Sequence, residues 1–338
     1  MRILQTASSV IAGLMLATVG HAQQSHYHVA HKFTIGGSGS WDYLAIDTVG
    51  HRLFIARENR VTVVDPTNGH VLGEITGLNR AHGVAFAYPT GHGFITSGED
   101  SSVVMFDLKT LKVLGKTTAA VDCDAILYDP ATGRVFTFNG DAGSSSVIDA
   151  TTGKRIANIT LPGKPEFGVA DGKGKLYVNI EDKSEVAEID ARAMRVTRHW
   201  SIAPCISPSG LAIDVAHARL FSGCHSKVLG VSDAVAGKLI TTAPIGVGVD
   251  AGRFDAATQL AFASTGDGKM TVIHEDSPGK FSVVDNVTTM PGARTMELDP
   301  QNHHLYTASA RFGKLPVSGQ GGRPPIIPGT FTLLVLER

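Results

Sequence analysis

Several scarcities limit the classes of protein to which this sequence can belong. Its 30 basic and 31 acidic residues nearly cancel and form no run of one sign, so we expect no nucleic-acid partner. No apolar run beyond the N-terminus approaches the roughly 20 residues that span a bilayer, so we expect no membrane span. Walker loops, GxSxG elbows, CxxCH motifs and paired CxxC motifs are missing. These absences remove several enzyme classes but leave metal-assisted hydrolysis and elimination.

The first 22 residues have the parts of a secretory signal peptide. Arg2 supplies a positive charge, residues 7–19 are mostly apolar, and the small residues Gly20 and Ala22 precede the expected cleavage point. We therefore predict a signal peptide over residues 1–22 and a mature protein that is periplasmic or secreted.

Cysteine is scarce as well, with three residues in the chain. Cys205 and Cys224 flank PSGLAIDVAHARLFSG, which predicts a strand, a turn and a second strand, so both thiols would meet at one end of a hairpin. In an oxidising compartment this favours a disulfide, worth about 3 kcal/mol on the chain-entropy model. Cys123 is then predicted to be a buried, unreactive thiol.

A seven-fold internal repeat determines the predicted architecture. Related heptads recur at intervals of 40 to 44 residues. They are WDYLAID (41–47), AHGVAFA (81–87), CDAILYD (123–129), PEFGVAD (165–171), PSGLAID (208–214), VDAGRFD (249–255) and ARTMELD (293–299). A second column keeps the same period and opens a turn in five repeats: Asp65, Asp107, Asp149, Asp190 and Asp233.

Each repeat contains four short apolar runs separated by turn residues, which predicts four strands. Seven such units indicate an all-β fold, a seven-bladed β-propeller with four antiparallel strands per blade. The last repeat lacks its fourth strand at the C-terminus, and HVAHKFTIGG (28–37) has the pattern to supply it. We therefore expect residues 23–338 to form a single domain whose ring is closed by an N-terminal strand, which removes a sheet edge.

Several second strands carry a recognisable motif. The segments are RLFIAREN, KLYVNIED, RLFSGCHS and HLYTASAR, and the sequence Tyr177, Val178, Asn179 matches the YVTN repeat best. Over essentially the whole mature chain the sequence resembles exported YVTN-repeat seven-bladed β-propellers, neighbours of the seven-bladed lactonase-like propellers. The resemblance implies fold and compartment more than activity, because such propellers include lactone hydrolases, lyases, nucleic-acid binders and proteins without a known role.

The second heptad position is expected to surround the mouth of the central channel. It reads Asp42, His82, Asp124, Glu166, Ser209, Asp250 and Arg294 around the ring. Whereas the turn column repeats one residue type, this mouth column stays polar but changes chemistry from blade to blade. That variation is typical of a binding site assembled from several blades, although each side chain has the alternative of bonding only backbone or ordered water.

These residue types suggest a ligand site with a divalent cation. Asp250, Glu166 and Asp124 offer oxygen ligands suited to Ca²⁺ or Mg²⁺, and His82 would extend the choice to Zn²⁺. If the protein is an enzyme, we hypothesise that His82 or Glu166 acts as base and that Arg294 holds an anionic group.

A long loop rich in proline and glycine interrupts the last repeat at residues 311–329. Loops of this length inside a domain are usually functional or disordered. It leaves the blade on the mouth face, so it could bring Arg311 to a ligand, or it could pack on the rim without any role in binding.

Three functions are compatible with these residues. The first is an exported propeller that binds a small polar or anionic ligand at the channel mouth, with a divalent cation such as Ca²⁺, Mg²⁺ or Zn²⁺. The second is a metal-dependent hydrolase or lyase acting there on a lactone-like substrate. The third is a scaffold that binds a protein partner and performs no catalysis.

Overall fold

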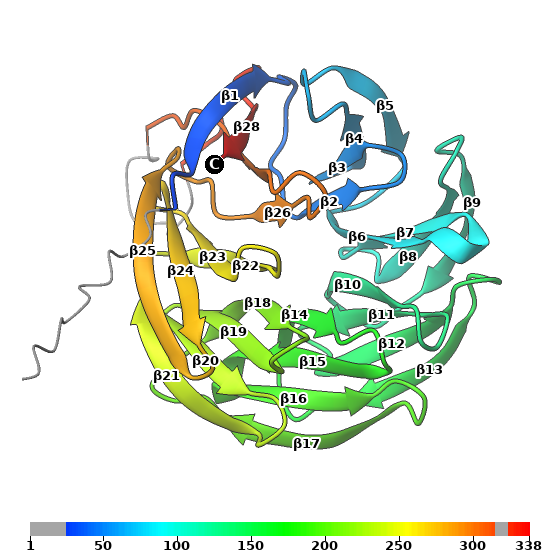
Figure 1. Cartoon of the computed structure of the whole chain (residues 1–338). Coiled ribbons are helices and arrows are strands. Elements are labelled where there is room, and N and C mark those ends of the chain that lie inside the picture. The colour runs from blue at the N-terminus through cyan, green and yellow to red at the C-terminus, as the bar shows by residue number, and fades with distance from the viewer. Residues whose placement is uncertain (1–24, 315–323) are drawn as a thin grey trace, which may run out of the picture.

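The protein folds into a ring of small sheets. The computed structural model describes residues 25–314 and 324–338, so the predicted signal peptide lies outside the described residues. Within them, seven antiparallel sheets of four strands follow one another around the ring (Figure 1). The predicted seven-bladed β-propeller is confirmed. No helix of this described part has the length and apolar character of a membrane-spanning segment.

Each blade begins with its innermost strand. Blade 1 contains β2 (Leu44–Asp47), β3 (Arg52–Arg57), β4 (Arg60–Val64) and β5 (Val71–Thr76). Blade 2 contains β6 (Ala81–Ala87), β7 (His92–Ser97), β8 (Ser102–Asp107) and β9 (Val113–Thr118). Blade 3 contains β10 (Cys123–Asp129), β11 (Arg134–Asn139), β12 (Ser144–Asp149) and β13 (Arg155–Thr160). Blade 4 contains β14 (Pro165–Ala170), β15 (Lys175–Ile180), β16 (Glu185–Asp190) and β17 (Arg195–Ser201).

The remaining blades follow the same order except the last. Blade 5 contains β18 (Pro208–Asp214), β19 (Arg219–Cys224), β20 (Val228–Asp233) and β21 (Lys238–Pro244). Blade 6 contains β22 (Val249–Asp255), β23 (Leu260–Thr265), β24 (Lys269–Ser277) and β25 (Lys280–Thr288). Blade 7 contains β26 (Met296–Leu298), β27 (Leu305–Ser309), β28 (Thr332–Glu337) and β1 (His28–Thr34). Two short 3₁₀ turns, η1 (Tyr88–Thr90) and η2 (Glu181–Lys183), lie in connections.

Blade 7 combines strands from both ends of the described chain. β1 pairs with β28 in antiparallel register, from His28 opposite Glu337 to Thr34 opposite Thr332. Just before β1, the buried Tyr27 donates a hydrogen bond to the carbonyl of His303 at 2.8 Å and packs edge-on against Phe262 of blade 6. The N-terminal strand is therefore attached both to its own blade and to the neighbouring one.

The repeated aspartates serve the local turns. Asp149, for example, accepts backbone N–H bonds from Thr151 and Thr152 at 3.1 and 2.8 Å. A carboxylate that caps its own turn in this way needs no partner from elsewhere in the fold, which explains why the residue type repeats from blade to blade.

The blades pack face to face through apolar side chains, and the inner strands of blades 5 and 6 lie close together. A Cβ at Gly210 would lie 2.5 Å from the Gly252 nitrogen, so only glycine fits there. In blade 5 a disulfide joins Cys205 to Cys224, with Cα atoms 5.4 Å apart, as the sequence predicts. Cys123 is free and buried, and burial raises its pKa to about 11, so the thiol is unreactive.

Candidate functional site

Irregular pairing of the inner strands places the mouth residues. In five blades the register between the first two strands shifts across the second heptad position. The shifted intervals contain His82, Asp124, Glu166, Ser209 and Asp250. A bulge leaves its residue out of the ladder and re-aims the side chain, which is how bulged positions come to serve binding sites. The mouth column is thus set apart by backbone geometry as well as by residue type.

These bulges border a cavity of about 760 Å³ at the mouth of the ring. Six of the seven mouth residues line it, namely Asp42, His82, Asp124, Glu166, Asp250 and Arg294. The seventh, Ser209, lies beneath and donates a hydrogen bond to Asp250 Oδ1 at 3.1 Å. The cavity walls also include Tyr43, Glu58 and Arg80, which the sequence pattern does not single out. Glu58 and Arg80 stand outside the heptads or at their edge, so no repeated column marks them.

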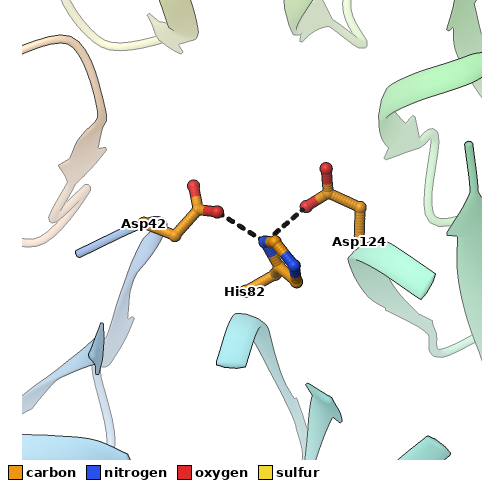
Figure 2. Close-up of side chains that lie close together, drawn as sticks. All are labelled: Asp42, His82 and Asp124. Atoms are coloured by element: carbon orange, nitrogen blue, oxygen red, sulfur yellow. Dashed lines mark hydrogen bonds and ion pairs between the residues drawn. The ribbon is translucent and has the colours of Figure 1, made fainter. Parts of the chain in front are cut away.

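His82 is the centre of the polar wall. Its Nδ1 lies 2.5 Å from Asp42 Oδ2 and 3.3 Å from Asp124 Oδ1, so carboxylates from the blades on both sides converge on one nitrogen (Figure 2). Burial disfavours the charged imidazolium, but the hydrogen bond to Asp42 and the charge of Asp124 outweigh it and raise the pKa of His82. Burial likewise raises the pKa of Asp124, and the nearby carboxylates of Asp42 and Asp250 raise it further.

The other edge of the His82 ring is packed into the protein. Nε2 is buried and has no hydrogen-bond partner within residues 25–314 and 324–338. A Cβ at Gly98 would lie only 2.7 Å from it, so the glycine leaves the space that the ring occupies. His82 therefore presents Nδ1 to the cavity, whereas Nε2 faces the interior.

Asp250 and Arg294 form a pair of their own. Arg294 Nε donates to Asp250 Oδ2 at 2.5 Å, and Ser209 binds the other carboxylate oxygen. Because the guanidinium is engaged in this way, Arg294 lines the cavity but its charge is already balanced by Asp250.

Glu166 has a different environment. Its Oε1 lies 3.8 Å from Lys164 Nζ, and Lys164 lies closer, at 3.3 Å, to Glu181 Oε2. Burial raises the pKa of Glu166, and the carboxyl groups of Asp124 and Glu181 raise it further. The raised pKa favours the protonated form of Glu166, which is the form that can donate a proton.

Side chains from three blades close the channel below the cavity. Tyr43 of blade 1 and Phe167 of blade 4 meet edge-on with ring centroids 5.2 Å apart. Arg253 of blade 6 lies over Phe167 at 4.9 Å and makes two hydrogen bonds to Glu297, at 2.8 and 3.1 Å. Since these blades are not neighbours, their side chains meet only by crossing the central axis. The cavity therefore has a floor, and burial among four mouth carboxylates raises the pKa of Tyr43 well above its usual value.

One side of the cavity is apolar. Trp41, Phe312 and Ile326 line it together with prolines and glycines from blades 6 and 7. Phe312 and Ile326 pair across the base of the long loop, so the described part of this loop forms cavity wall. Arg311, which we predicted as a ligand residue, is exposed and is not among the residues lining the cavity. The loop tip, residues 315–323, lies outside the described residues.

Donor geometry favours a cation. Five carboxyl groups line the cavity beside the guanidinium groups of Arg80 and Arg294, namely those of Asp42, Glu58, Asp124, Glu166 and Asp250. One donor atom each from Asp42, His82 and Asp124 lies within 4.8 Å of the others, a spacing that can hold a metal ion.

The metal set that we predicted from the sequence was Asp250, Glu166 and Asp124. Only Asp124 belongs to the group that the fold brings together. Asp250 is bound to Arg294, and Glu166 lies beside Lys164 and Glu181. Asp42 and His82, predicted as ligand residues, are the other two members.

No family model matches the chain. Two curated relatives, the uncharacterized proteins YncE of Salmonella typhi and Salmonella typhimurium, are each 27% identical over 161 residues. The match spans 45% of this chain and 45% of each relative, so the chain covers less than half of their length. Among solved structures, hydrazine synthase of Kuenenia stuttgartiensis superimposes with a TM-score of 0.68 at 14% identity, covering 85% of this chain and 96% of that one. At this identity the similarity shows the propeller fold alone.

Proposed function

We propose that this protein binds a divalent cation between Asp42, His82 and Asp124, and that the cation recruits a small polar or anionic ligand into the mouth cavity. The observation that carries the proposal is the convergence of two carboxylates on His82 Nδ1 at 2.5 and 3.3 Å. It occurs in a cavity in which carboxyl groups outnumber guanidinium groups. A cation there would neutralise the crowded carboxylates and leave coordination positions for a ligand.

The preferred ligand can be inferred from the groups of the cavity wall that are not already paired with other side chains. Arg294 is engaged by Asp250, so it offers little charge to an incoming anion. A carboxylate or carbonyl ligand would therefore bind through the cation, while Trp41 and Phe312 would contact its apolar part. On this proposal, removal of the cation abolishes ligand binding.

Calorimetric titration with Ca²⁺, Mg²⁺, Mn²⁺ and Zn²⁺ tests cation binding. We expect saturable binding that weakens about 100-fold or more in Asp42→Asn and in Asp124→Asn, because each variant loses a charged ligand. Asp141→Asn is the matched control, since Asp141 is an exposed aspartate on a blade 3 loop of the same face. If none of the four ions binds the wild-type protein, the proposal fails and the scaffold function becomes the better account.

A second candidate function is a metal-dependent hydrolase or lyase acting on a lactone-like substrate. The specific observation in its favour is Glu166, a partly buried carboxyl group in the wall of the same cavity, whose raised pKa suits a general acid. His82 is less suited to the role of base that we hypothesised, because Nε2 is buried and Nδ1 already contacts two carboxylates.

Turnover separates the two functions. A panel of lactones followed by proton release should reveal an activity that drops about 100-fold or more in Glu166→Gln if Glu166 supplies the proton. Wild-type protein that binds a cation but turns over none of the panel supports the binding function instead.

The cellular location is part of the proposal. A leader-like N-terminus and the Cys205 to Cys224 disulfide both support export, and the YVTN resemblance points to the same compartment. We propose that residues 23–338 are the mature single-domain protein, periplasmic or secreted. Cell fractionation and N-terminal sequencing test this, with Gln23 expected as the first residue.

A further inference from the structure

A second group of chemically active side chains lies at the other end of the blades. Asp214 ends β18 of blade 5, whereas the mouth residue Ser209 stands near the start of the same strand. His217 follows in the turn to β19, and Glu275 belongs to β24 of blade 6. The group therefore lies in the seam between blades 5 and 6, on the face opposite the mouth.

The three side chains converge closely. His217 Nδ1 lies 2.5 Å from Asp214 Oδ2 and 3.7 Å from Glu275 Oε2, and one donor atom from each residue lies within 4.8 Å of the others. Asp214 Oδ1 accepts the backbone N–H of Ala216 at 2.9 Å, which fixes the orientation of the carboxylate. The equivalent aspartates of other blades, such as Asp129 and Asp255, make the same turn contact, so the feature particular to this seam is the approach of His217 and Glu275.

Glu275 is the unusual member of the group. Its side chain is only 1% exposed, and neither carboxylate oxygen has a hydrogen-bond partner among the described residues. Asp214 is also 1% exposed, so two carboxyl groups are buried side by side. Asp214 has His217 and a backbone N–H as partners, but an ionised Glu275 without a partner would be strongly destabilising. The seam between two packed sheets is ordinarily filled with apolar side chains. Carboxyl groups buried there need a partner that compensates for their lost hydration.

The charge balance indicates what kind of partner is missing. Arg219 is the permanent cation nearby, and it pairs with Asp233 at 2.9 Å. Metal binding requires a neutral His217 and ionised carboxylates, and in that state Asp214, Glu275 and Asp233 carry three negative charges against the single positive charge of Arg219. Two negative charges remain, and a divalent cation would neutralise both.

We propose that Asp214, His217 and Glu275 form a second metal site, selective for Zn²⁺ or a divalent ion of similar chemistry. One imidazole and two carboxylates form a donor set suited to Zn²⁺, whereas Ca²⁺ requires six or more oxygens. His217 is 40% exposed, which gives the ion a path from solvent. The site is independent of the mouth and serves to join blades 5 and 6.

The neighbouring seam provides a natural control. His303 Nδ1 lies 2.8 Å from Asp255 Oδ2, so the same kind of pair occurs one blade further on. No third carboxylate joins that pair to form a metal group in the part of the chain that the structure describes. This seam therefore offers a histidine–aspartate control, whose two residues come from blades 7 and 6 rather than from one turn.

Equilibrium dialysis against Zn²⁺ tests the site in the mature chain carrying Asp42→Asn and Asp124→Asn, which disables the mouth. We expect one zinc ion per chain to remain bound and to be lost on adding Glu275→Gln or His217→Ala. His303→Ala should change nothing. Tetrahedral Co²⁺ absorption, measured on the same proteins, should appear and disappear in parallel.

Two outcomes overturn the proposal: the mouth-disabled protein binds no zinc, or zinc stays bound after both Glu275→Gln and His217→Ala. In the first case Asp214 and Glu275 share a proton, which agrees with the effect of burial and of Asp214 in raising the pKa of Glu275. Circular dichroism and thermal melting in EDTA establish that each variant is folded, and His217 lies on an exposed turn where substitution is tolerated. Failure here leaves the mouth proposal standing, because that proposal is tested by the Asp42 and Asp124 variants alone.

Discussion

His82 presents a single nitrogen to the cavity, and protons compete with a metal ion for it. The Asp42 hydrogen bond and the charge of Asp124 raise the pKa of His82, and burial raises the pKa of Asp124. Both groups must lose protons to bind a cation, so affinity should rise with pH until their raised pKa values are passed. We expect titrations between about pH 5 and about pH 8 to show affinity increasing and protons being released. A flat pH profile would contradict ligation by His82.

Gly98 helps to fix the position of the His82 ring, because it leaves space for the Nε2 edge. A Cβ at this position would be 2.7 Å from His82 Nε2, so Gly98→Ala must displace the imidazole. We expect cation affinity to fall about tenfold and the free energy of unfolding to fall by about 1 to 3 kcal/mol. Gly115→Ala is the control, because nothing lies within 4 Å of its added Cβ. Equal titration curves for the two variants would show that the ring position does not matter.

Glu166 makes stability depend on pH in an unusual direction. Burial raises its pKa from the ordinary 4.5 to about 9, so the folded protein binds a proton that the unfolded chain releases. Its contribution to stability is therefore present below about pH 4.5 and is lost as pH rises toward 9. Glutamine needs no proton, so it removes the cost of protonating this side chain on folding, and we expect Glu166→Gln to be more stable than wild type in urea near pH 8, by about 1 to 3 kcal/mol. The two proteins should differ least at acid pH.

The sequence repeat predicts which residues lie on adjacent blades but not which side chains contact each other. Asp42 and His82 are 40 residues apart and Arg294 and Asp250 are 44 apart, so the mouth column predicts that each pair lies in adjacent blades. The column does not predict which neighbours bind each other, because bulge geometry and side-chain rotamers decide that. It also misses Tyr43, whose neighbours Trp41 and Leu44 are apolar core residues and hide its role in the floor.

The disulfide closes the hairpin of β18 and β19. Its removal should lower stability mainly by increasing the conformational entropy of the unfolded chain. Cys205→Ser with Cys224→Ser removes a link across 19 residues, so we expect the free energy of unfolding to fall by about 3 kcal/mol. Urea denaturation measures the change. Reductant should lower the wild-type stability to that of the variant and leave the variant unaffected. A reductant effect on the variant would point to some other cause.

The ring as a whole depends on its first strand. Deleting residues 25–34 removes β1, exposes the edge of β28 and takes away the Tyr27 contacts with blade 6. We expect the thermal transition to shift sharply downward and size-exclusion chromatography to detect association through the open edge. Lys32→Ala, an exposed position of β1, should behave as wild type. A monomeric deletion variant of unchanged stability would show that closure by β1 is dispensable.

The overall architecture could be predicted because the sequence contains seven repeats of the same structural unit. Each blade repeats the same alternation and the same turn aspartates, so the fold follows from one unit and its period. The group of Asp214, His217 and Glu275 could not, because it joins the inner strand of one blade to the third strand of the next and occurs in one seam only among the described residues. A feature that does not repeat leaves no periodic trace in the sequence.

Because Tyr43, Phe167 and Arg253 meet on the axis, the mouth cavity is a pocket with a single opening. A polymer cannot be threaded through the ring, and any ligand leaves by the route through which it arrived. Microscopic reversibility then applies to the single opening of the cavity. Narrowing or widening that opening without touching the bound molecule changes its arrival and departure rates by the same factor. Residence time can thus be tuned at the rim while the affinity set deeper in the cavity stays constant.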